Sequence, residues 1–426
     1  VTKIVARGGH LNINGIRLYS WDANSPEPEG YDTNVSDGRS FLLAERGGRM
    51  DIIDSEISHL GYSPGEPSGL SWRKTATSGD PRDPNVIRTG ATGSVLRSNV
   101  HDNYFGQYSY EAYGLVIRES EFHHNLYYGI DPHDYSSGFE VAFNKVHHNG
   151  NHGIIFSRGC VDNKIHHNEV YDNASHGIML DRGSERNEIT DNTVYNNGDG
   201  IAIFQSSNNL IRGNILRDNN RGVRINATFD SDDIYDGLSN NNIVQGNTIE
   251  NSGQYGIYLY ERADKNIIEG NTITGSQLDG IYIKTGGNII RNNAVRVNRH
   301  GIAIIGGAGA AYTPGGIEPL YQPGHKNEIY GNTIEDNNGN GILLRGAVET
   351  VIGPQLSQPN SAHANSIRTN GASGIRMDTG AVGNVVFGNT IVGNVADGVL
   401  VRGADSNKNR ITRNSITANG GRGHNL

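Results

Sequence analysis

Residues 151–204 read NHGIIFSRGCVDNKIHHNEVYDNASHGIMLDRGSERNEITDNTVYNNGDGIAIF, in which one pattern occurs three times. Each repeat begins with a glycine and an isoleucine, at Gly153, Gly177 and Gly200. The two steps are 24 and 23 residues long. One turn of a three-sided β-coil has about this length, and the 3.6-residue apolar spacing of helical repeats is missing. The stretch therefore predicts stacked β-coils.

The same glycine step recurs along most of the chain. It stands at Gly129, Gly153, Gly177, Gly200, Gly222, Gly256, Gly280, Gly301, Gly341, Gly374 and Gly398. Most steps are 22 to 24 residues, and the longer steps indicate insertions near 227–241, 303–326 and 346–365. Leucine-rich repeats share this length but need a leucine-rich consensus, which is absent. We therefore predict an all-β chain, a single right-handed parallel β-helix domain over 1–426, with less regular coils over 1–110 and regular coils over 111–426.

An asparagine motif alternates with the glycine step, as in Asn163-x-Ile165-x-x-Asn168-x-Val170. Asparagine tolerates the left-handed backbone of a tight corner, and stacked amides can hydrogen-bond along a ladder. We therefore interpret these asparagines as structural.

Alternation along the glycine-led strands separates core from surface, because successive side chains of a strand point to opposite faces. The first and third residues after each glycine are apolar in almost every coil, so the second and fourth should face outward. Outward residues expected to bind substrate are Arg73, Arg118, Asp181, Arg224, Tyr258, Tyr260, Tyr282 and Lys284, and Asp134 and Arg182 at the ends of their strands are expected to bind it as well. Arg73 after Gly69 and Arg118 after Gly114 are placed in this column by the same register.

Such a column suits an anionic polysaccharide. Coils stack about 4.8 Å apart, close to the rise of one sugar, while arginine pairs with carboxylates and tyrosine stacks on sugar faces. A net charge of −9 argues against a nucleic-acid partner. Neither a metal nor another cofactor is expected.

The rest of the composition bears on disulfides, membrane spans and a leader segment. The single cysteine, Cys160, excludes an intramolecular disulfide and is expected to be a buried thiol. No run of about 18 apolar residues predicts a membrane span, and Val1 opens no signal-like segment, so any leader is expected outside this sequence. The oligomeric state is left open.

One coil departs from the pattern. It reads Tyr128-Gly-Ile-Asp-Pro-His-Asp134 and sends a proline inward, with Asp131 and His133 outward. Proline removes a ladder donor from a central strand, and such departures often mark function. Arg158 ends the strand one coil later, and Asp181-Arg182 end the strand after that. A histidine, acids and two guanidiniums are therefore predicted to converge.

These segments resemble the catalytic region of the periplasmic mannuronan C5-epimerases of alginate-producing bacteria; the secreted calcium-dependent epimerases carry a related Asp-Pro-His motif. The resemblance rests on 128–134, on His152-Gly-Ile-Ile-Phe-Ser-Arg158 and on Gly177-Ile-Met-Leu-Asp-Arg182, with Leu60-Gly61-Tyr62 and Gly69-Leu70-Ser71 upstream. It covers roughly 40–230, beyond which only generic β-helix repeats match. It implies inversion of C5 in hexuronates of an acidic polysaccharide, from β-D-mannuronate to α-L-guluronate in alginate.

The chemistry of such a reaction assigns roles. The proton removed is α to a carboxylate, whose charge must be neutralised, and we expect Arg158 to do this with a bidentate grip. His133 is the expected base. The proton for the opposite face would come from Tyr128 or a water. Asp131 would orient His133 or bind a substrate hydroxyl, with Asp134 able to do either, and Asp181 and Arg182 would form subsites.

Three other functions are compatible with parts of this pattern. A polysaccharide lyase would share the proton abstraction and then expel the 4-O substituent. A hydrolase would need paired carboxylates, but alternation separates Asp131 from Asp134 unless the chain turns after Pro132. A non-catalytic polysaccharide-binding solenoid would tolerate loss of His133. A polymeric substrate favours the periplasm or secretion.

Overall fold

The computed structural model describes residues 2–36, 38–62, 68–74, 90–228, 237–306, 323–354 and 363–425. They group into two compact units, Val1–Ala202 and Ile203–Leu426, and β22 (Asp199–Phe204) contains the boundary. The three predicted insertions lie partly outside the described residues, at 229–236, 307–322 and 355–362. Among the described residues, no helix is long and apolar enough to cross a membrane.

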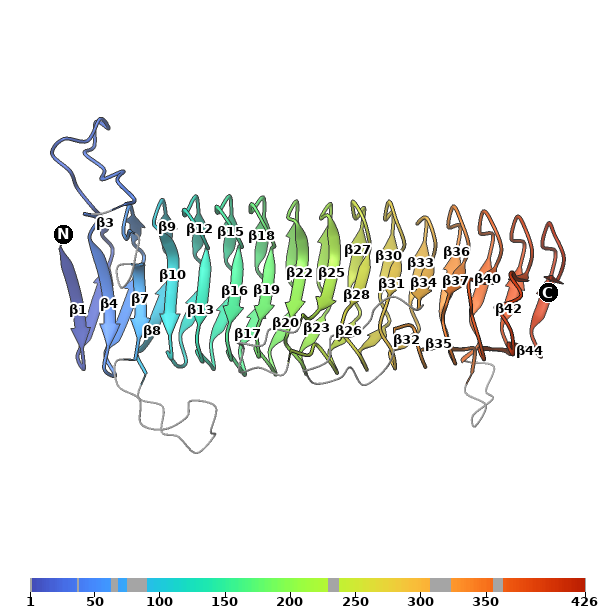
Figure 1. The fold of residues 1–426 in the computed structure, drawn as a ribbon. Coiled ribbons are helices and arrows are strands. Elements are labelled where there is room, and N and C mark those ends of the chain that lie inside the picture. The colour runs from blue at the N-terminus through green and yellow to red at the C-terminus, as the bar shows by residue number, and fades with distance from the viewer. Residues whose placement is uncertain are drawn as a thin grey trace. The chain divides into compact units, whose positions relative to one another are not determined.

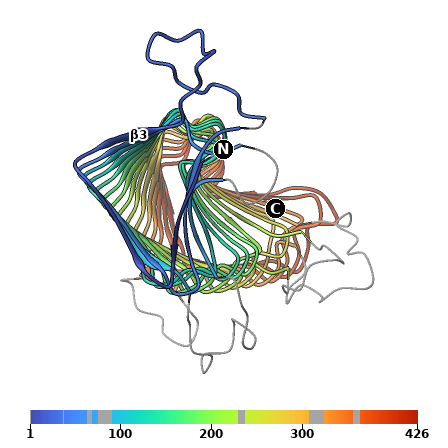
Figure 2. The ribbon, with the colours of Figure 1, turned by 90° about the vertical axis from the view of Figure 1, so that its left-hand side faces the viewer.

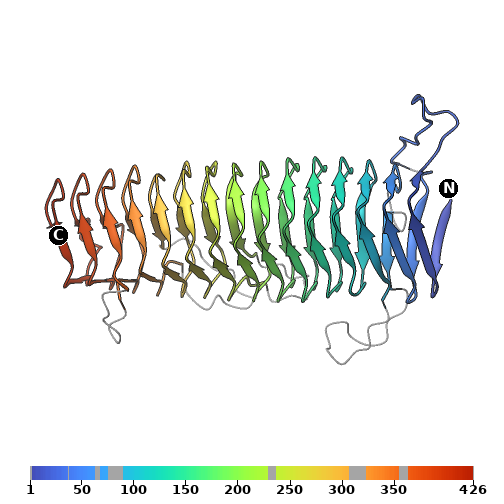
Figure 3. The same ribbon diagram turned by 180° about the vertical axis from the view of Figure 1, so that it is seen from behind.

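The first unit consists of three parallel sheets, with one strand of each sheet in every coil (Figure 1; from behind in Figure 3). Sheet A contains β1 (Lys3–Arg7), β4 (Phe41–Glu45), β7 (Gly69–Arg73), β10 (Phe105–Tyr110), β13 (Ile130–His133), β16 (Ile154–Ser157) and β19 (Ile178–Asp181). Sheet B contains β2 (His10–Asn14), β5 (Arg49–Ile53), β8 (Thr92–Leu96), β11 (Val116–Arg118), β14 (Glu140–Ala142), β17 (Lys164–His166) and β20 (Glu188–Thr190). Sheet C contains β3 (Arg17–Tyr19), β6 (Glu56–Ser58), β9 (Asn99–His101), β12 (Glu121–His123), β15 (Lys145–His147), β18 (Glu169–Tyr171) and β21 (Thr193–Tyr195).

The second unit repeats this arrangement, again with one strand of each of the three sheets in every coil. Its sheet A contains β25 (Arg221–Asn226), β28 (Ile257–Tyr260), β31 (Ile281–Ile283), β34 (Ile302–Ile305), β37 (Ile342–Arg345), β40 (Ile375–Asp378), β43 (Val399–Val401) and β46 (His424–Asn425). Sheet B contains β23 (Leu210–Arg212), β26 (Ile243–Gln245), β29 (Ile267–Glu269), β32 (Ile289–Arg291), β35 (Glu328–Tyr330), β38 (Val351–Ile352), β41 (Val385–Phe387) and β44 (Arg410–Thr412). Sheet C contains β24 (Ile215–Arg217), β27 (Thr248–Glu250), β30 (Thr272–Thr274), β33 (Ala294–Arg296), β36 (Thr333–Glu335), β39 (Ser366–Arg368), β42 (Thr390–Val392) and β45 (Ser415–Thr417).

The predicted fold class is confirmed, because both units are built from parallel strands that pair with the equivalent strand of the next coil. In Figure 2 the coils of the first unit, coloured blue to green, each have three sides. The predicted alternation also holds: Ile154 and Phe156 of β16, like Ile178 and Leu180 of β19, are fully buried. The division into a single domain remains a prediction.

Glycine lies at or next to the start of most sheet A strands because the next coil lies too close for a side chain. A Cβ at Gly153 would lie 2.7 Å from Val170 Cγ1 and 2.8 Å from the carbonyl oxygen of Gly177. A Cβ at Gly129 would meet the equivalent atoms one coil earlier, at 2.6 Å from Val146 Cγ1. The repeated glycine of the sequence is therefore a steric requirement of coil stacking.

Asparagine ladders hold the corners, as the sequence predicted. Asn144 Nδ2 donates to Asn168 Oδ1 at 2.9 Å, and Asn168 Nδ2 donates to Asn192 Oδ1 at the same distance. Asn168 Nδ2 also donates to the carbonyl oxygen of Val141. These amides are buried but satisfied, which is the condition for a stable buried polar group.

The prediction for Arg118 is wrong. Gly114 leads into β11 of sheet B, so Arg118 lies on a different side of the coil from His133. The sheet A strand of that coil is β10, which contains Gly106 as its second residue. The pattern missed it because a polar residue, Gln107, takes the inward position opposite Ile130. Gly106 precedes Gly129 by 23 residues, so spacing alone would have located this strand.

Candidate functional site

The candidate site lies on the outer face of sheet A in the first unit. Parallel register places side chains of successive coils in rows. One row contains Ser71, Tyr108 and Asp131. The next row contains Arg73, Tyr110, His133, Ser157 and Asp181. Five consecutive coils therefore contribute to one surface, as predicted for all of these positions except Ser71, Tyr108 and Tyr110.

His133 and Asp134 form a hydrogen-bonded pair despite being adjacent in the chain. His133 Nδ1 lies 2.5 Å from Asp134 Oδ2. Strand alternation would separate them, but the backbone leaves β13 with positive φ at Asp134 (32°) and Tyr135 (62°). This turn returns the Asp134 carboxylate to His133. Because a carboxylate accepts the Nδ1 proton, neutral His133 has its lone pair on Nε2, where a base needs it.

The surroundings of His133 pull its pKa in two directions. Burial lowers the pKa, because the side chain is only 23% exposed, but the hydrogen bond to Asp134 and the charges of Asp131 and Asp134 outweigh it. The result is a raised pKa. The positive charge of Arg158 opposes this rise in pKa, because the guanidinium is close enough to interact electrostatically with the imidazole.

Asp131 faces outward from the strand, but its residue is only 1% exposed, so the expectation of a solvent-facing carboxylate is wrong. Tyr108 is its register partner on β10, and the charge of Asp131 acts on the Tyr108 phenol. Among the described residues Asp131 Oδ1 has no hydrogen-bond partner. Burial raises the pKa of Asp131 to about 7, with the charges of Asp134 and Asp181 acting in the same direction and that of His133 opposing. Near neutral pH this side chain is therefore poised between acid and carboxylate.

Arg158 follows β16 directly and has a positive φ of 62°. Its backbone is fixed on both sides: its N–H donates to the carbonyl oxygen of Asp181 at 3.0 Å, and its carbonyl accepts from Tyr135 N at 2.8 Å. The side chain is exposed. The side chain of Arg158 is therefore exposed to solvent while its backbone is held in place. A cation that binds the carboxylate of a ligand needs both properties.

Asp181 and Arg182 pair with each other. Arg182 Nη2 lies 2.8 Å from Asp181 Oδ2, which also accepts a hydrogen bond from Ser157 Oγ at 2.8 Å. Asp181 is buried, whereas the Arg182 side chain is one-third exposed. A ligand on this surface would therefore meet Arg182 rather than Asp181.

Two tyrosines approach the same cluster. The Tyr128 ring stacks on Phe105 at 5.5 Å and on His152 at 5.4 Å. Burial raises the pKa of Tyr128, and the charges of Asp131 and Asp181 add to the rise. Tyr128 is therefore both a packing residue and a protonated phenol near the acids.

Tyr108 was missed by the sequence pattern. Its ring lies 6.0 Å from the His133 ring, and the Arg73 guanidinium lies 5.0 Å from its centroid. Burial raises its pKa far above the ordinary value, with the charge of Asp131 adding to the rise. Arg73 also donates to Ser68 Oγ. Arg73 thus lies on the site face as predicted. Arg118 lies on sheet B instead, with its guanidinium 5.3 Å from the centroid of the Phe143 ring.

The predicted residues of the second unit form a group of their own. Tyr258 stacks on Tyr282 at 5.4 Å and on Tyr260 at 5.6 Å, and Lys284 Nζ lies 5.0 Å from the Tyr260 centroid. The structure adds Tyr255, which stacks on Tyr258 at 4.9 Å. Arg224 donates to Asn226 Oδ1. The result is an aromatic platform edged by cations.

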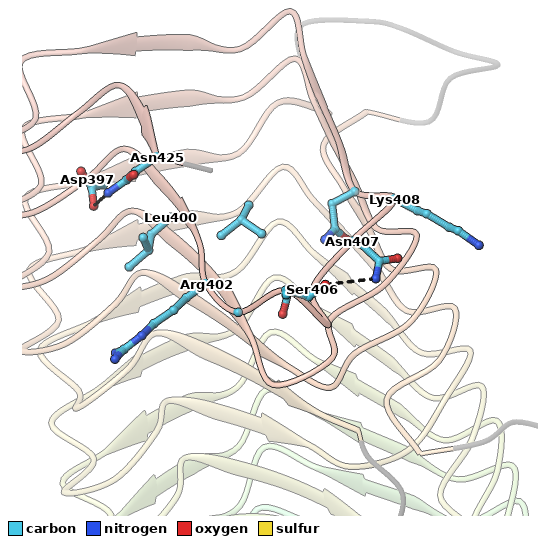
Figure 4. Close-up of a pocket in the computed structure, with 11 residues that line it drawn as sticks. Asp397, Leu400, Arg402, Ser406, Asn407, Lys408 and Asn425 are labelled. Atoms are coloured by element: carbon cyan, nitrogen blue, oxygen red, sulfur yellow. Dashed lines mark hydrogen bonds between the residues drawn. The ribbon is translucent and has the colours of Figure 1, made fainter.

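A hollow of about 760 Å³ lies elsewhere, against the last described coils of the second unit (Figure 4). Asp397, Arg402 and Lys408 are its charged lining residues. In Figure 4 the side chains of Arg402 and Lys408 extend away from each other. The lining contains no histidine or tyrosine that could act as a base or proton donor.

Comparison with known proteins supports the predicted resemblance. The chain is 36% identical to the mannuronan C5-epimerase AlgG of Azotobacter vinelandii over 241 residues, which are 56% of this chain and 45% of that protein. It is 33% identical to the mannuronan C5-epimerase of Pseudomonas aeruginosa over 138 residues, 32% of this chain and 25% of that protein. The chain thus spans less than half the length of either relative.

Solved structures agree with these sequence relatives. The crystal structure of the periplasmic alginate epimerase AlgG matches with a TM-score of 0.56 and 26% identity, over 70% of each chain. The family model described as the right handed beta helix region matches residues 86–235 and 238–416. The resemblance inferred from the sequence is confirmed, and the chain belongs to the right-handed β-helix family.

Proposed function

We propose that this protein is a polymer-level C5-epimerase that converts β-D-mannuronate to α-L-guluronate in an alginate-like polysaccharide. The observation that carries the proposal is the His133–Asp134 pair, at 2.5 Å, on the same face as Asp131 and next to Arg158. The mannuronan C5-epimerases among its relatives support the choice of substrate.

The first requirement is neutralisation of the substrate carboxylate, because a proton α to an ionised carboxylate is very weakly acidic. Arg158 meets this requirement with an exposed guanidinium on a fixed backbone. A guanidinium stays protonated and can bind both carboxylate oxygens at once. The same cation then stabilises the enediolate that forms as the proton leaves.

The second requirement is a base on one face of the sugar. His133 provides it through Nε2, since Asp134 binds Nδ1. When Nε2 accepts the C5 proton, the imidazolium is stabilised by the Asp134 carboxylate. Loss of such a base typically lowers turnover ~10²–10⁴-fold.

The third requirement is a proton for the opposite face. Tyr128 supplies it directly or through a water, because its raised pKa keeps the phenol protonated at neutral pH. Asp131 contributes as a buried acid with a pKa of about 7. In its protonated form it donates a hydrogen bond to the substrate and leaves the His133–Asp134 pair undisturbed.

Further sugars of the polymer occupy subsites. In the first unit Arg73 and Arg182 bind carboxylates, and Tyr108 lies under the Arg73 side chain. In the second unit Tyr258, Tyr260 and Tyr282 stack on sugar rings, while Arg224 and Lys284 bind carboxylates.

The proposal also places the protein in the periplasm or outside the cell. A polymer of this kind lies outside the cytoplasm, and the solved relative is described as periplasmic. The polysaccharide is the only partner that the proposal requires.

The test is proton NMR of polymannuronate incubated with the full chain in deuterated water. Guluronate signals with deuterium at C5, and no rise in ultraviolet absorbance, are expected from the wild type and not from H133A. H10A is the matched control, because His10 is an exposed histidine of sheet B. Unsaturated chain ends would identify a lyase instead. A polymer left unchanged by the wild type would overturn the proposed activity on polymannuronate.

A further inference from the structure

A His-His-Asn sequence occurs three times in the first unit, outside the site described above. The three copies are His123-His124-Asn125, His147-His148-Asn149 and His166-His167-Asn168. In each copy the first histidine ends a strand (β12, β15 and β17) and the asparagine belongs to a corner ladder. The second histidine has a positive φ, of 52°, 53° and 55° in chain order, and is exposed. The left-handed corner turns the second imidazole back towards the first.

The two rings of each copy meet through the same atoms. The Nδ1–Nδ1 distance is 2.8 Å in 123/124, 2.8 Å in 147/148 and 3.0 Å in 166/167. The ring planes are nearly perpendicular, at 88°, 86° and 86°. Two nitrogens at this distance share one proton or one metal ion.

Hydrogen bonds on the far side of the strand histidines determine which nitrogen holds the proton. His123 Nε2 lies 2.9 Å from Asn99 Oδ1, His147 Nε2 2.8 Å from Glu121 Oε1, and His166 Nε2 3.3 Å from Glu140 Oε1. These oxygens only accept, so Nε2 carries the proton and Nδ1 has the lone pair. A histidine that binds a metal through one nitrogen usually donates its other N–H to such an oxygen.

We propose that each His-His corner is a two-imidazole chelate for a divalent transition-metal ion of the copper(II) type. Imidazole nitrogens bind such ions at about 2.0 Å, so two ligands at right angles are ~2.8 Å apart and two tetrahedral ligands ~3.3 Å apart. The observed spacings of 2.8, 2.8 and 3.0 Å lie nearer the right-angle value of tetragonal copper than the tetrahedral value of zinc. Copper(II) also binds nitrogen ligands most tightly among the divalent first-row ions.

The remaining coordination positions belong to water. Among the residues that the structure describes, no group of three histidine, cysteine, aspartate or glutamate side chains is arranged to hold a metal. Each chelate therefore has two protein ligands and opens to solvent through the exposed corner ring. Binding needs no net loss of protons, because the corner histidine can move its proton from Nδ1 to Nε2. For His148 that Nε2 lies 3.9 Å from Asp172 Oδ2.

The first two chelates lie on adjacent coils. The rings of His123 and His147 stack at 5.2 Å, and those of His124 and His148 stack at 5.1 Å. Copper ions held at both corners would therefore be close enough for magnetic coupling, which provides a signature that scattered surface histidines would lack.

The test is titration of the full chain with copper(II) sulfate, followed by electron paramagnetic resonance and calorimetry. We expect three sites per chain with two-nitrogen hyperfine structure, and broadening by coupling between two of them. H124N/H148N/H167N should lose these sites, since asparagine tolerates the same left-handed backbone; circular dichroism checks that its strands are retained. H10N is the control and should bind like the wild type. Unchanged copper binding by the triple variant, or spectra with a single nitrogen ligand, would overturn the proposal.

Discussion

His133 Nδ1 and Asp134 Oδ2 are 2.5 Å apart because the chain turns into the left-handed region immediately after β13. A strand that continued straight would have pointed the two side chains to opposite faces. The pair leaves Nε2 of His133 as the basic nitrogen, and the proposed reaction depends on that tautomer.

The first prediction concerns D134N. Removing the carboxylate removes the main cause that raises the pKa of His133, so this pKa should fall. Because the neutral imidazole is the base, activity is lost as pH drops through this pKa. The acid limb of kcat/KM should therefore move to lower pH in D134N, with reduced turnover. NMR rates from pH 4 to 9 measure the shift, and an unmoved acid limb would contradict the assignment of His133.

The second prediction concerns the stability of D131N. The pKa of Asp131 is about 7 in the folded protein, above its unfolded value, so the native state binds the extra proton. The proton on Asp131 contributes fully to the free energy of unfolding below the unfolded pKa. This contribution is lost as pH rises towards 7, and the loss is on the order of 4 kcal/mol at most. The stability of D131N relative to the wild type should therefore be greater at pH 7.5 than at pH 4.5. Urea midpoints of both proteins at the two pH values test this prediction. The same difference between the two proteins at both pH values would refute it.

The third prediction separates charge from geometry at Arg158. R158A should lower kcat by ~10²–10³-fold, the usual cost of losing a group that stabilises developing negative charge. R158K keeps the charge but loses the bidentate grip, so its activity should fall between that of R158A and the wild type. Steady-state rates on polymannuronate provide the comparison. Full activity in R158A would remove Arg158 from the proposed chemistry.

The fourth prediction tests the platform of the second unit. Y258A should raise KM for long polymannuronate several-fold while kcat changes little, because a stacking surface contributes to binding and not to proton transfer. Y258F keeps the ring and should behave like the wild type. If KM were unchanged in Y258A, the platform would not bind substrate.

The fifth prediction concerns the asparagine ladder. N168A removes an amide that donates to Asn192 and Val141 and accepts from Asn144, leaving buried groups unsatisfied. A loss of roughly 1–3 kcal/mol is expected. N24A is the matched control, since Asn24 is an exposed residue of the same unit. Thermal unfolding of both variants checks the contrast, and equal melting temperatures would contradict the role of the ladder.

Much of the site could be predicted from sequence because it depends on spacing along a single strand. The step from Gly153 to Gly177 predicted the coil, and alternation after Gly129 correctly turned Pro132 inward and His133 outward. Tyr108 escaped the pattern because the polar Gln107 takes its coil's inward position. Arg118 was misplaced because a glycine also precedes sheet B strands, and a glycine step alone cannot distinguish the sides of a coil.

The sequence by itself determined the repeat length and the three-sided coil, and it predicted the residues that we propose for the chemistry, since these follow from side-chain alternation and from where only glycine fits. Tertiary structure decided how that chemistry is tuned. The turn that pairs Asp134 with His133, the burial that raises the pKa of Asp131 to about 7 and the stacking of Tyr128 on His152 all involve atoms of other coils or backbone angles. Such contacts depend on three-dimensional packing, and no periodicity along the chain encodes them.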